Sequence, residues 1–259
     1  MKTTTMLLSG ILFVGGMGLN SVAAFAEAGP IPANRETKAQ VKFIEDDSKQ
    51  PPVDPTDPDP DKPEVPVDPT NPDKPVEPGT NGPLSLDYAS ILDFGEQKIS
   101  NKDQVYFAAP QLFRDSEGKI DEKNPVPNYA QVTDRRGGEK GWTLSVKQNG
   151  QFKSLTNKKE LKGAEITFKN AQVASKSASK APGSVKESFS LTADGTGIAE
   201  NVVSASANEG FGTWVYRFGD ESTMAKSIQL SVPGSSVKEA DAYQTTLTWT
   251  LKDVPTNNK

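Results

Sequence analysis

The sequence predicts an all-β protein with a single folded domain, an antiparallel β-sandwich-like structure at residues 84–259. Three observations support this fold class. Apolar and polar residues alternate in ten short runs after Pro83, groups of Gly, Asn, Asp and Pro separate the runs, and helical periodicity is scarce. Short alternating runs at roughly 8 to 12-residue spacing are typical of a sandwich or barrel. A chain of this length can bury a core without disulfides.

The first 26 residues are predicted to be a secretory signal peptide. Lys2 precedes a mostly apolar run at residues 6–19, and Ala-Phe-Ala follows at 24–26 as a small-x-small cleavage sequence. The alternative is a transmembrane anchor, but this run is shorter than the roughly 18 to 20 residues that a spanning helix needs. We therefore expect cleavage after Ala26, a mature chain without a membrane span, and a secreted, extracellular location.

Residues 27–50 form a short, mostly polar segment with one possible strand at 37–44. In this stretch Ala39, Val41 and Phe43 alternate with polar neighbours. A lone strand is not stable by itself. Three alternatives stay open: the strand adds to the edge of the later domain, it waits for a partner, or the segment is disordered.

Residues 51–83 are predicted to be a disordered Pro/Asp-rich linker. They contain 12 of the 20 prolines, and Val-Asp-Pro-Thr at 53–56 returns at 67–70. Proline removes backbone donors, so helix and sheet ladder are excluded, and an extended spacer of about 3.1 Å per residue is expected. The acidic residues do not indicate a calcium loop, because such a loop needs a glycine at its turn and the nearest is Gly79.

The alternating runs of residues 84–259 predict the strands in order. They lie at 84–88, 104–107, 129–132, 142–146, 166–168, 189–191, 202–207, 214–218, 228–232 and 247–251. Residues 174–187, rich in Ser, Lys and Ala, are predicted to be a long polar loop.

Composition and charge exclude several classes of function. The chain has no Cys and no His, which excludes disulfides, Cys/His zinc sites and a Ser-His-Asp triad. The formal net charge is −5, but residues 51–83 carry 8 acids and 2 bases, whereas residues 84–259 carry 21 acids and 22 bases. A nearly neutral domain argues against a nucleic-acid partner. No metal and no cofactor are expected.

Catalysis is not expected either. Ser116 and Ser177 each precede a lysine at the Ser-x-x-Lys spacing of penicillin-interacting enzymes, but the companion Ser-Asp-Asn and Lys-Thr-Gly elements do not occur. A pair of carboxylates for glycoside cleavage is defined by distance in space, so a glycan hydrolase remains a minor alternative.

Two Trp-x-Leu motifs carry a family resemblance. Trp142-Thr-Leu144 lies in Gly-Trp-Thr-Leu-Ser-Val-Lys, and Trp249-Thr-Leu251 lies near the end of the sequence, before Asp253 and Pro255. With Leu-Asp-Phe-Gly at 92–95 and Ser-Val-Pro-Gly at 231–234, residues 82–256 resemble the WxL domain family of Gram-positive surface proteins. The resemblance implies noncovalent attachment to the cell wall through peptidoglycan. It also implies partner surface proteins from the same gene cluster and, for some members, binding of host matrix proteins.

The motif residues Trp142, Leu144, Trp249 and Leu251 are the candidate binding residues, and two interpretations of them stay open. Indole rings can stack on sugars at a glycan-binding surface. However, alternate residues of a strand share one face, so each motif also has the pattern of a buried core face. Trp214 has the same ambiguity.

Two functions from different classes follow. The leading hypothesis is a secreted, non-catalytic module that associates with the wall through its C-terminal domain. The alternative is an interaction subunit that docks a partner surface protein, for which the strand at 37–44 would pair with the partner's sheet edge.

Overall fold

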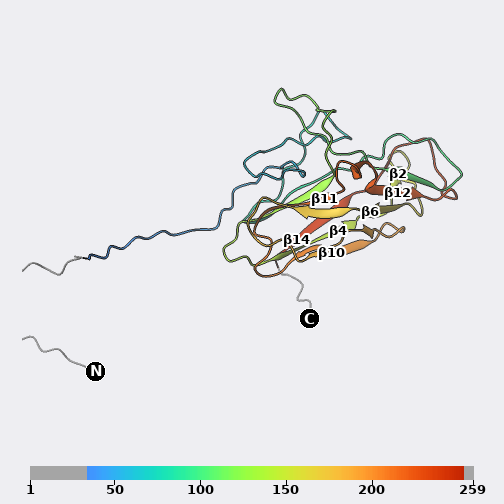
Figure 1. Cartoon of the computed structure of the whole chain (residues 1–259). Coiled ribbons are helices and arrows are strands. Elements are labelled where there is room, and N and C mark those ends of the chain that lie inside the picture. Colours follow the sequence, from blue (N-terminus) through green and yellow to red (C-terminus); the bar gives the residue numbers. More distant parts are fainter. Residues whose placement is uncertain (1–33, 254–259) are drawn as a thin grey trace, which may run out of the picture. The chain divides into compact units, whose positions relative to one another are not determined.

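The computed structural model describes residues 34–253, in which residues 43–253 include an antiparallel β domain (Figure 1). Secondary structure there consists of strands and one 3₁₀ turn, without an α-helix among the described residues. The predicted all-β fold class is therefore confirmed. The predicted signal peptide lies outside the described residues. Within residues 34–253, no helix is both long and apolar enough to cross a membrane.

The elements follow the predicted runs closely. Their bounds are β1 (Leu84–Ala89), β2 (Gln104–Phe107), β3 (Tyr129–Asp134), β4 (Trp142–Gln148), β5 (Lys153–Ser154), β6 (Glu165–Phe168), β7 (Ala171–Ala174), β8 (Ser184–Val185), β9 (Phe189–Ser190), β10 (Ile198–Ala205), β11 (Gly212–Phe218), η1 (Met224–Lys226), β12 (Ile228–Val232), β13 (Tyr243–Gln244) and β14 (Leu247–Lys252). All ten predicted runs overlap a strand. The predicted polar loop at 174–187 contains the short strand β8.

The strands form three four-stranded sheets with the orders β1-β3-β11-β7, β14-β4-β10-β8 and β2-β12-β6-β9, and β13 pairs with β5. Every strand pair is antiparallel. In Figure 1, β4, β10 and β14 lie on one side of the domain, and β11, β6, β12 and β2 lie on the other. This layering agrees with the predicted sandwich.

The main core fills the space between these layers. Each sheet contributes the alternate residues that the sequence pattern marks as apolar, which is how a strand buries one face. The largest fully buried apolar side chains of this core are Trp142, Phe168, Phe218, Leu144, Ile166, Leu191, Ile228 and Val132.

A second, smaller core covers the opposite face of the β1-β3-β11-β7 sheet. All six residues of β3 are buried, so this strand is covered on both faces. Tyr129 packs against Tyr88 with ring centroids 5.0 Å apart, and against Phe113 at 6.5 Å. Val53, which precedes the domain by some thirty residues, is fully buried in this cluster. The proline-rich segment therefore supplies part of the core.

Residues 51–83 differ in this respect from the predicted spacer. As expected, the prolines leave only isolated bridges, such as Val53 with Pro63 and Val67 with Pro75. The segment nevertheless packs on the domain, because side-chain amides replace the missing ladder. The Gln131 Oε1 accepts from the Val53 backbone N–H at 2.8 Å, and the Gln131 Nε2 donates to the Pro51 carbonyl at 2.9 Å.

The sequence repeat in this segment produces a repeated local structure. Asp54 accepts hydrogen bonds from the backbone N–H and the hydroxyl of Thr56, and Asp68 accepts the same two bonds from Thr70. Such Asx turns form without a partner strand. The valine that opens each copy, Val53 or Val67, points inward and is buried.

Residues 34–50 contain no strand. The segment has neither coil nor arrow in Figure 1, and its apolar side chains are exposed. The strand predicted at 37–44 is therefore not formed in this structure, because no neighbouring strand pairs with it.

Candidate functional site

The two Trp-x-Leu motifs lie side by side on neighbouring strands. β14 pairs with β4 so that Leu251 is opposite Leu144 and Trp249 is opposite Val146. The sequence places the motifs about a hundred residues apart, and only the sheet register brings them together. All four motif side chains lie on the core-facing side of this sheet, where they contribute to the main core or pack against it.

Trp142 is a core residue. Its side chain is only 2% exposed, and its indole Nε1 donates to the Gly210 carbonyl at 2.9 Å. Gly210 allows this contact because it has no side chain: a Cβ there would lie 2.7 Å from the Trp142 Nε1. Leu144 is fully buried beside it. A ligand on the surface therefore has no access to the first motif.

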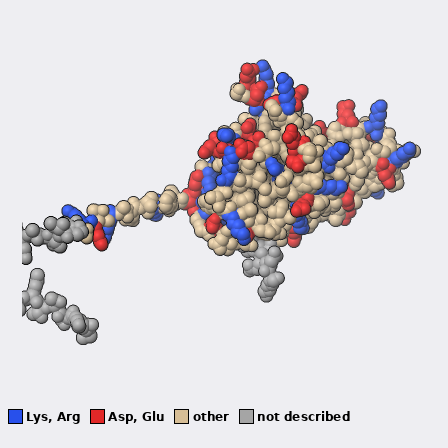
Figure 2. Space-filling model, viewed as in Figure 1, with Lys and Arg blue, Asp and Glu red and all other residues tan. Residues whose placement is uncertain are grey.

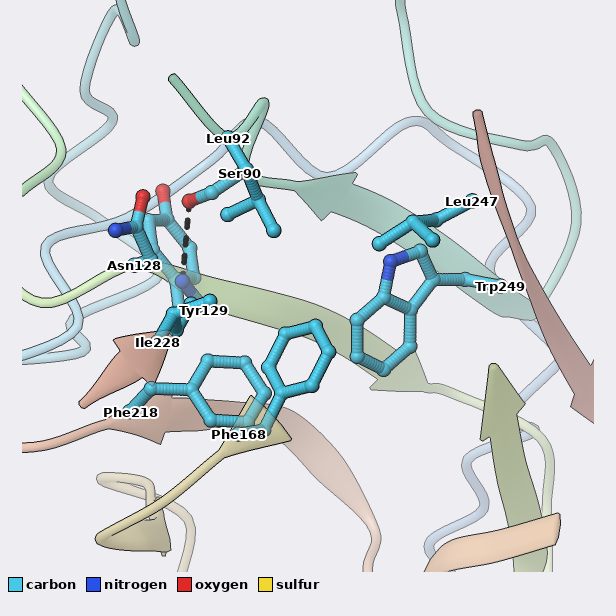
Figure 3. A pocket seen from close by; sticks show the side chains of 9 residues that line it. All are labelled: Ser90, Leu92, Asn128, Tyr129, Phe168, Phe218, Ile228, Leu247 and Trp249. Atoms are coloured by element: carbon cyan, nitrogen blue, oxygen red, sulfur yellow. Dashed lines mark hydrogen bonds between the residues drawn. The ribbon is translucent and has the colours of Figure 1, made fainter. Parts of the chain in front are cut away.

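Trp249 is only half-buried. It lies against the aromatic rings of Phe168 and Phe218, with centroid distances of 6.3 and 6.4 Å. Figure 3 shows the indole to the side of these two rings, with Leu247 next to it. The hollow that these side chains line has a volume of about 10 Å³. That volume holds a single water molecule and excludes a sugar ring.

Two tryptophans with the same sequence pattern therefore differ in burial. Trp142 fits the core interpretation, as does Trp214, which is 6% exposed and donates from its Nε1 to the Phe211 carbonyl at 3.0 Å. Trp249 and Leu251 pack on the core and retain exposed surface. A direct contact of Trp249 with a ligand remains a prediction.

The outer face of the same two strands is polar. Thr248, Thr250 and Lys252 alternate with the motif residues on β14 and are exposed, as is Lys147 on β4. Asn149 holds the start of this face in place, because its Nδ2 donates to the hydroxyls of Thr246 and Thr248 at 2.9 and 2.8 Å. The motif pattern itself indicates this surface, since alternate residues of a strand face opposite ways.

A groove of about 290 Å³ lies beside the proline-rich segment. Its lining includes Lys49, Pro52, Glu64, Pro66, Val76 and Asp87. Burial raises the pKa of the Glu64 carboxyl, and the Asp54 charge adds to this shift. Sequence reasoning missed this groove, because it treated residues 51–83 as a free spacer.

Asp87 is the most perturbed acid beside this groove. Burial raises the pKa of its carboxyl to about 6, although three side-chain hydrogen bonds oppose the shift. The donors are the Ser85 hydroxyl at 2.5 Å, the Thr133 hydroxyl at 2.6 Å and the Gln131 Nε2 at 2.9 Å. Every one of these partners comes from β1 or β3 of the sheet below.

The two Ser-x-x-Lys pairs do not form a catalytic arrangement. The Lys180 ammonium pairs with Glu209 at 2.6 Å, while the Ser177 hydroxyl donates to the Phe211 carbonyl. The Lys119 ammonium pairs with Glu117 at 2.7 Å. Each lysine is thus held by a glutamate. Residues 34–253 contain no group of three acidic side chains arranged to hold a metal ion.

Charges of both signs are interspersed on the face of the molecule drawn in Figure 2. This agrees with the nearly neutral balance of residues 84–259. A phosphate-reading surface would gather lysines and arginines into one stripe.

Comparison with known proteins gives one match. A family model described as WxL domain, surface cell wall-binding, matches residues 32–255. The matched range includes the proline-rich segment, in agreement with its packing on the domain. No curated protein matches the chain. No solved structure matches it either. Because the family model spans most of the 259 residues, the chain belongs to the WxL family of surface cell wall-binding domains.

Proposed function

We propose that the chain is a secreted, non-catalytic surface protein that binds peptidoglycan noncovalently through its WxL domain. The family match over residues 32–255 is the observation that carries this proposal. The signal-peptide pattern of the first 26 residues supports export, and the Gram-positive cell wall is the expected location.

The outer face of β14 and β4 is the contact surface that we assign to the wall. On this face the exposed Thr248 is opposite Lys147, and the exposed Thr250 and Lys252 follow along β14. Hydroxyls can bond to the hydroxyl and amide groups of a glycan with peptide stems, and ammonium groups can pair with its carboxylates.

Co-sedimentation with purified peptidoglycan, free of protein and secondary wall polymers, tests the proposal. The mature chain should pellet with the wall material. A variant with Lys147→Glu and Lys252→Glu should pellet less, because both changes put a negative charge opposite the wall carboxylates. A matched variant with Lys98→Glu and Lys226→Glu, two exposed lysines outside this face, should pellet like the wild type.

Two results would contradict the proposal. If the wild type stays in the supernatant, the chain does not bind peptidoglycan. If both charge variants pellet equally, the contact surface lies elsewhere on the domain.

A second candidate function is supported by the N-terminal segment. Val41, Phe43 and Ile44 are 73, 88 and 82% exposed, so this short segment presents several apolar side chains close together, a feature of interaction sites. An interaction subunit that docks a partner surface protein would bury them, with wall or host-matrix binding indirect. This candidate predicts that wall material pellets the chain only when the partner is present.

A further inference from the structure

The N-terminal segment repeats the sequence of one strand of the domain. Residues 38–43 read Lys-Ala-Gln-Val-Lys-Phe, and residues 102–107 read Lys-Asp-Gln-Val-Tyr-Phe, so both stretches have the pattern Lys-x-Gln-Val-x-Phe. The second copy contains strand β2. The first copy therefore has the sequence of an edge strand while forming no strand in this structure.

β2 lies at the edge of its sheet with apolar side chains exposed to water. It pairs with β12 on one side, and no described residue pairs as a strand with its other side. Val105 is 50% exposed and Phe107 is 38% exposed. Proteins usually protect such edges with charges, prolines or covering loops, because an open edge recruits further strands.

The backbone of β2 has hydrogen-bonding groups available at this edge. The Ala108 N–H donates to the Ile228 carbonyl at 3.0 Å. In the register of β2 with β12, this bond shows that even-numbered residues of β2 direct their N–H and C=O groups toward β12. Alternate residues of an antiparallel strand direct their N–H and C=O to opposite sides. The N–H and C=O groups of Val105 and Phe107 therefore point away from β12, toward the open edge.

We propose that residues 41–44 of one copy add as a strand to the open edge of β2 in a second copy. Residues 38–40 then lie past Phe107, because the edge closes where the Ala109 N–H donates to the Asp93 carbonyl at 2.8 Å. In an antiparallel register with Val41 opposite Phe107, Phe43 lies opposite Val105. Cross-strand pairs of an aromatic and a β-branched residue stabilise a sheet. All four exposed apolar side chains then share one face of the extended sheet. The occupant is a second copy, because each copy's own segment is held at the other end of β3 from β2. Asp46 pairs with Arg135 directly after β3, whereas the Ala109 carbonyl at the end of β2 accepts from the Nδ2 of Asn128, directly before β3. The few residues between Phe43 and Asp46 are too short to span a strand of this length.

This inference does not rest on wall binding, and its test uses no wall material. The mature chain, residues 27–259, is examined by sedimentation velocity over a rising series of concentrations. We expect a monomer that converts to dimers or longer head-to-tail chains, because donor segment and acceptor edge are different surfaces.

Two variants remove one side of the contact each. The donor variant carries Val41→Lys and Phe43→Lys, which are so exposed that the domain should fold unchanged. The acceptor variant carries Val105→Lys, and Val237→Lys, at a valine 79% exposed elsewhere, is the matched control. Donor and acceptor variants should each remain monomeric, whereas the control should associate like the wild type.

Mixing the two defective variants is the decisive step. The donor variant keeps an intact β2 edge and the acceptor variant keeps an intact segment, so their mixture should form a complex of one copy of each. A wild type that stays monomeric at every concentration overturns the proposal. This result is also expected if the segment of each copy adds to the β2 edge of the same copy. Association that persists in both variants, or a mixture that stays monomeric, also overturns it.

Discussion

Gln131 donates a hydrogen bond from its side-chain nitrogen to the carboxylate of Asp87 over 2.9 Å, and both side chains are buried. The same nitrogen donates to the Pro51 carbonyl, and the Gln131 oxygen accepts from the Val53 N–H. One glutamine thus connects an acid of the sheet to the proline-rich segment that covers it. The first two predictions follow from this arrangement.

The Asp87 carboxyl makes the stability of the domain depend on pH. Its pKa is raised from 3.8 to about 6 in the folded state, so between these values the folded state binds more protons than the unfolded state. The free energy of unfolding therefore falls as pH rises through this window. We expect the contribution of Asp87 to the free energy of unfolding to fall by ~1 kcal/mol from pH 5 to pH 7.5.

Asp87→Asn isolates this contribution. The new amide can donate to the Ser85 hydroxyl while its oxygen accepts from Thr133 and Gln131, so the hydrogen bonds are kept without a titratable group. Urea unfolding of both proteins at pH 5 and pH 7.5 measures the difference, since other acids contribute equally to both. Identical pH dependence in wild type and variant would contradict the raised pKa.

Gln131→Met should loosen the proline-rich segment. The methionine fills a similar volume but leaves the Val53 N–H and the Pro51 carbonyl without their partners. The Val53 N–H is buried, and leaving such a group unsatisfied destabilises a protein by ~1–3 kcal/mol; the variant also removes the hydrogen bond from Gln131 to Asp87. Hydrogen exchange should show faster exchange of the Val53 amide, and limited proteolysis should show earlier cleavage within residues 51–83.

Gln97→Met is the matched control for this variant. Gln97 is exposed and donates a single hydrogen bond to the Phe94 carbonyl. It should therefore leave exchange at Val53 unchanged. Equal protection of that amide in Gln131→Met and wild type would show that the segment is held by other contacts.

The same glutamine shows where sequence reasoning stops. Proline density correctly excludes a ladder over residues 51–83, and only isolated bridges form. Nothing local to Val53 indicates that a side chain 78 residues away accepts its N–H. Alternation works better for longer strands, since β12 has the predicted bounds 228–232, whereas two-residue strands such as β13 depend on their neighbours for pairing.

Alternation predicts that both Trp-x-Leu motifs lie on strands, but it does not predict how exposed each tryptophan is. Both motifs alternate in the same way, and alternation alone assigns both tryptophans to one class. β4 lies inside its sheet, between β14 and β10, while β14 lies at the edge. Trp142 is opposite Ala205 of β10 and donates to the Gly210 carbonyl, whereas Trp249 lies on an edge strand that pairs only with β4. The different exposure of the two tryptophans therefore depends on contacts far away in the sequence.

Because the two motif tryptophans differ in exposure, replacing each with alanine should lower the free energy of unfolding by different amounts. Trp142→Ala removes a fully buried indole and should lower the free energy of unfolding by ~3–5 kcal/mol. Trp249→Ala removes a half-buried one and should cost less than about 3 kcal/mol. Guanidinium unfolding followed by circular dichroism measures both, and equal losses would contradict the assignment.

Trp249→Ala is also the variant with which a direct wall contact can be tested. Because it should remain folded, its pelleting with peptidoglycan can be compared with that of the wild type. Reduced pelleting would assign a contact to the indole. Unchanged pelleting would leave the polar outer face of β14 and β4 as the contact surface.

Gly141, immediately before the first motif, should not tolerate a side chain. It has a φ of +78°, and a Cβ there would lie 2.4 Å from the Ala205 carbonyl oxygen. Its own carbonyl accepts from the Arg136 guanidinium at 2.7 Å, so the turn into β4 cannot shift freely. We expect Gly141→Ala to lower the free energy of unfolding by at least ~2 kcal/mol.

Gly137→Ala is the matched control in the same turn region. A Cβ at Gly137 would have no neighbour within 4 Å, and its backbone is not in the left-handed region. This variant should change the free energy of unfolding by no more than about 0.5 kcal/mol. Urea unfolding of the two variants compares them directly. If Gly141→Ala is as stable as Gly137→Ala, the turn can rearrange, and the close approach of β4 to Ala205 does not fix the position of Trp142.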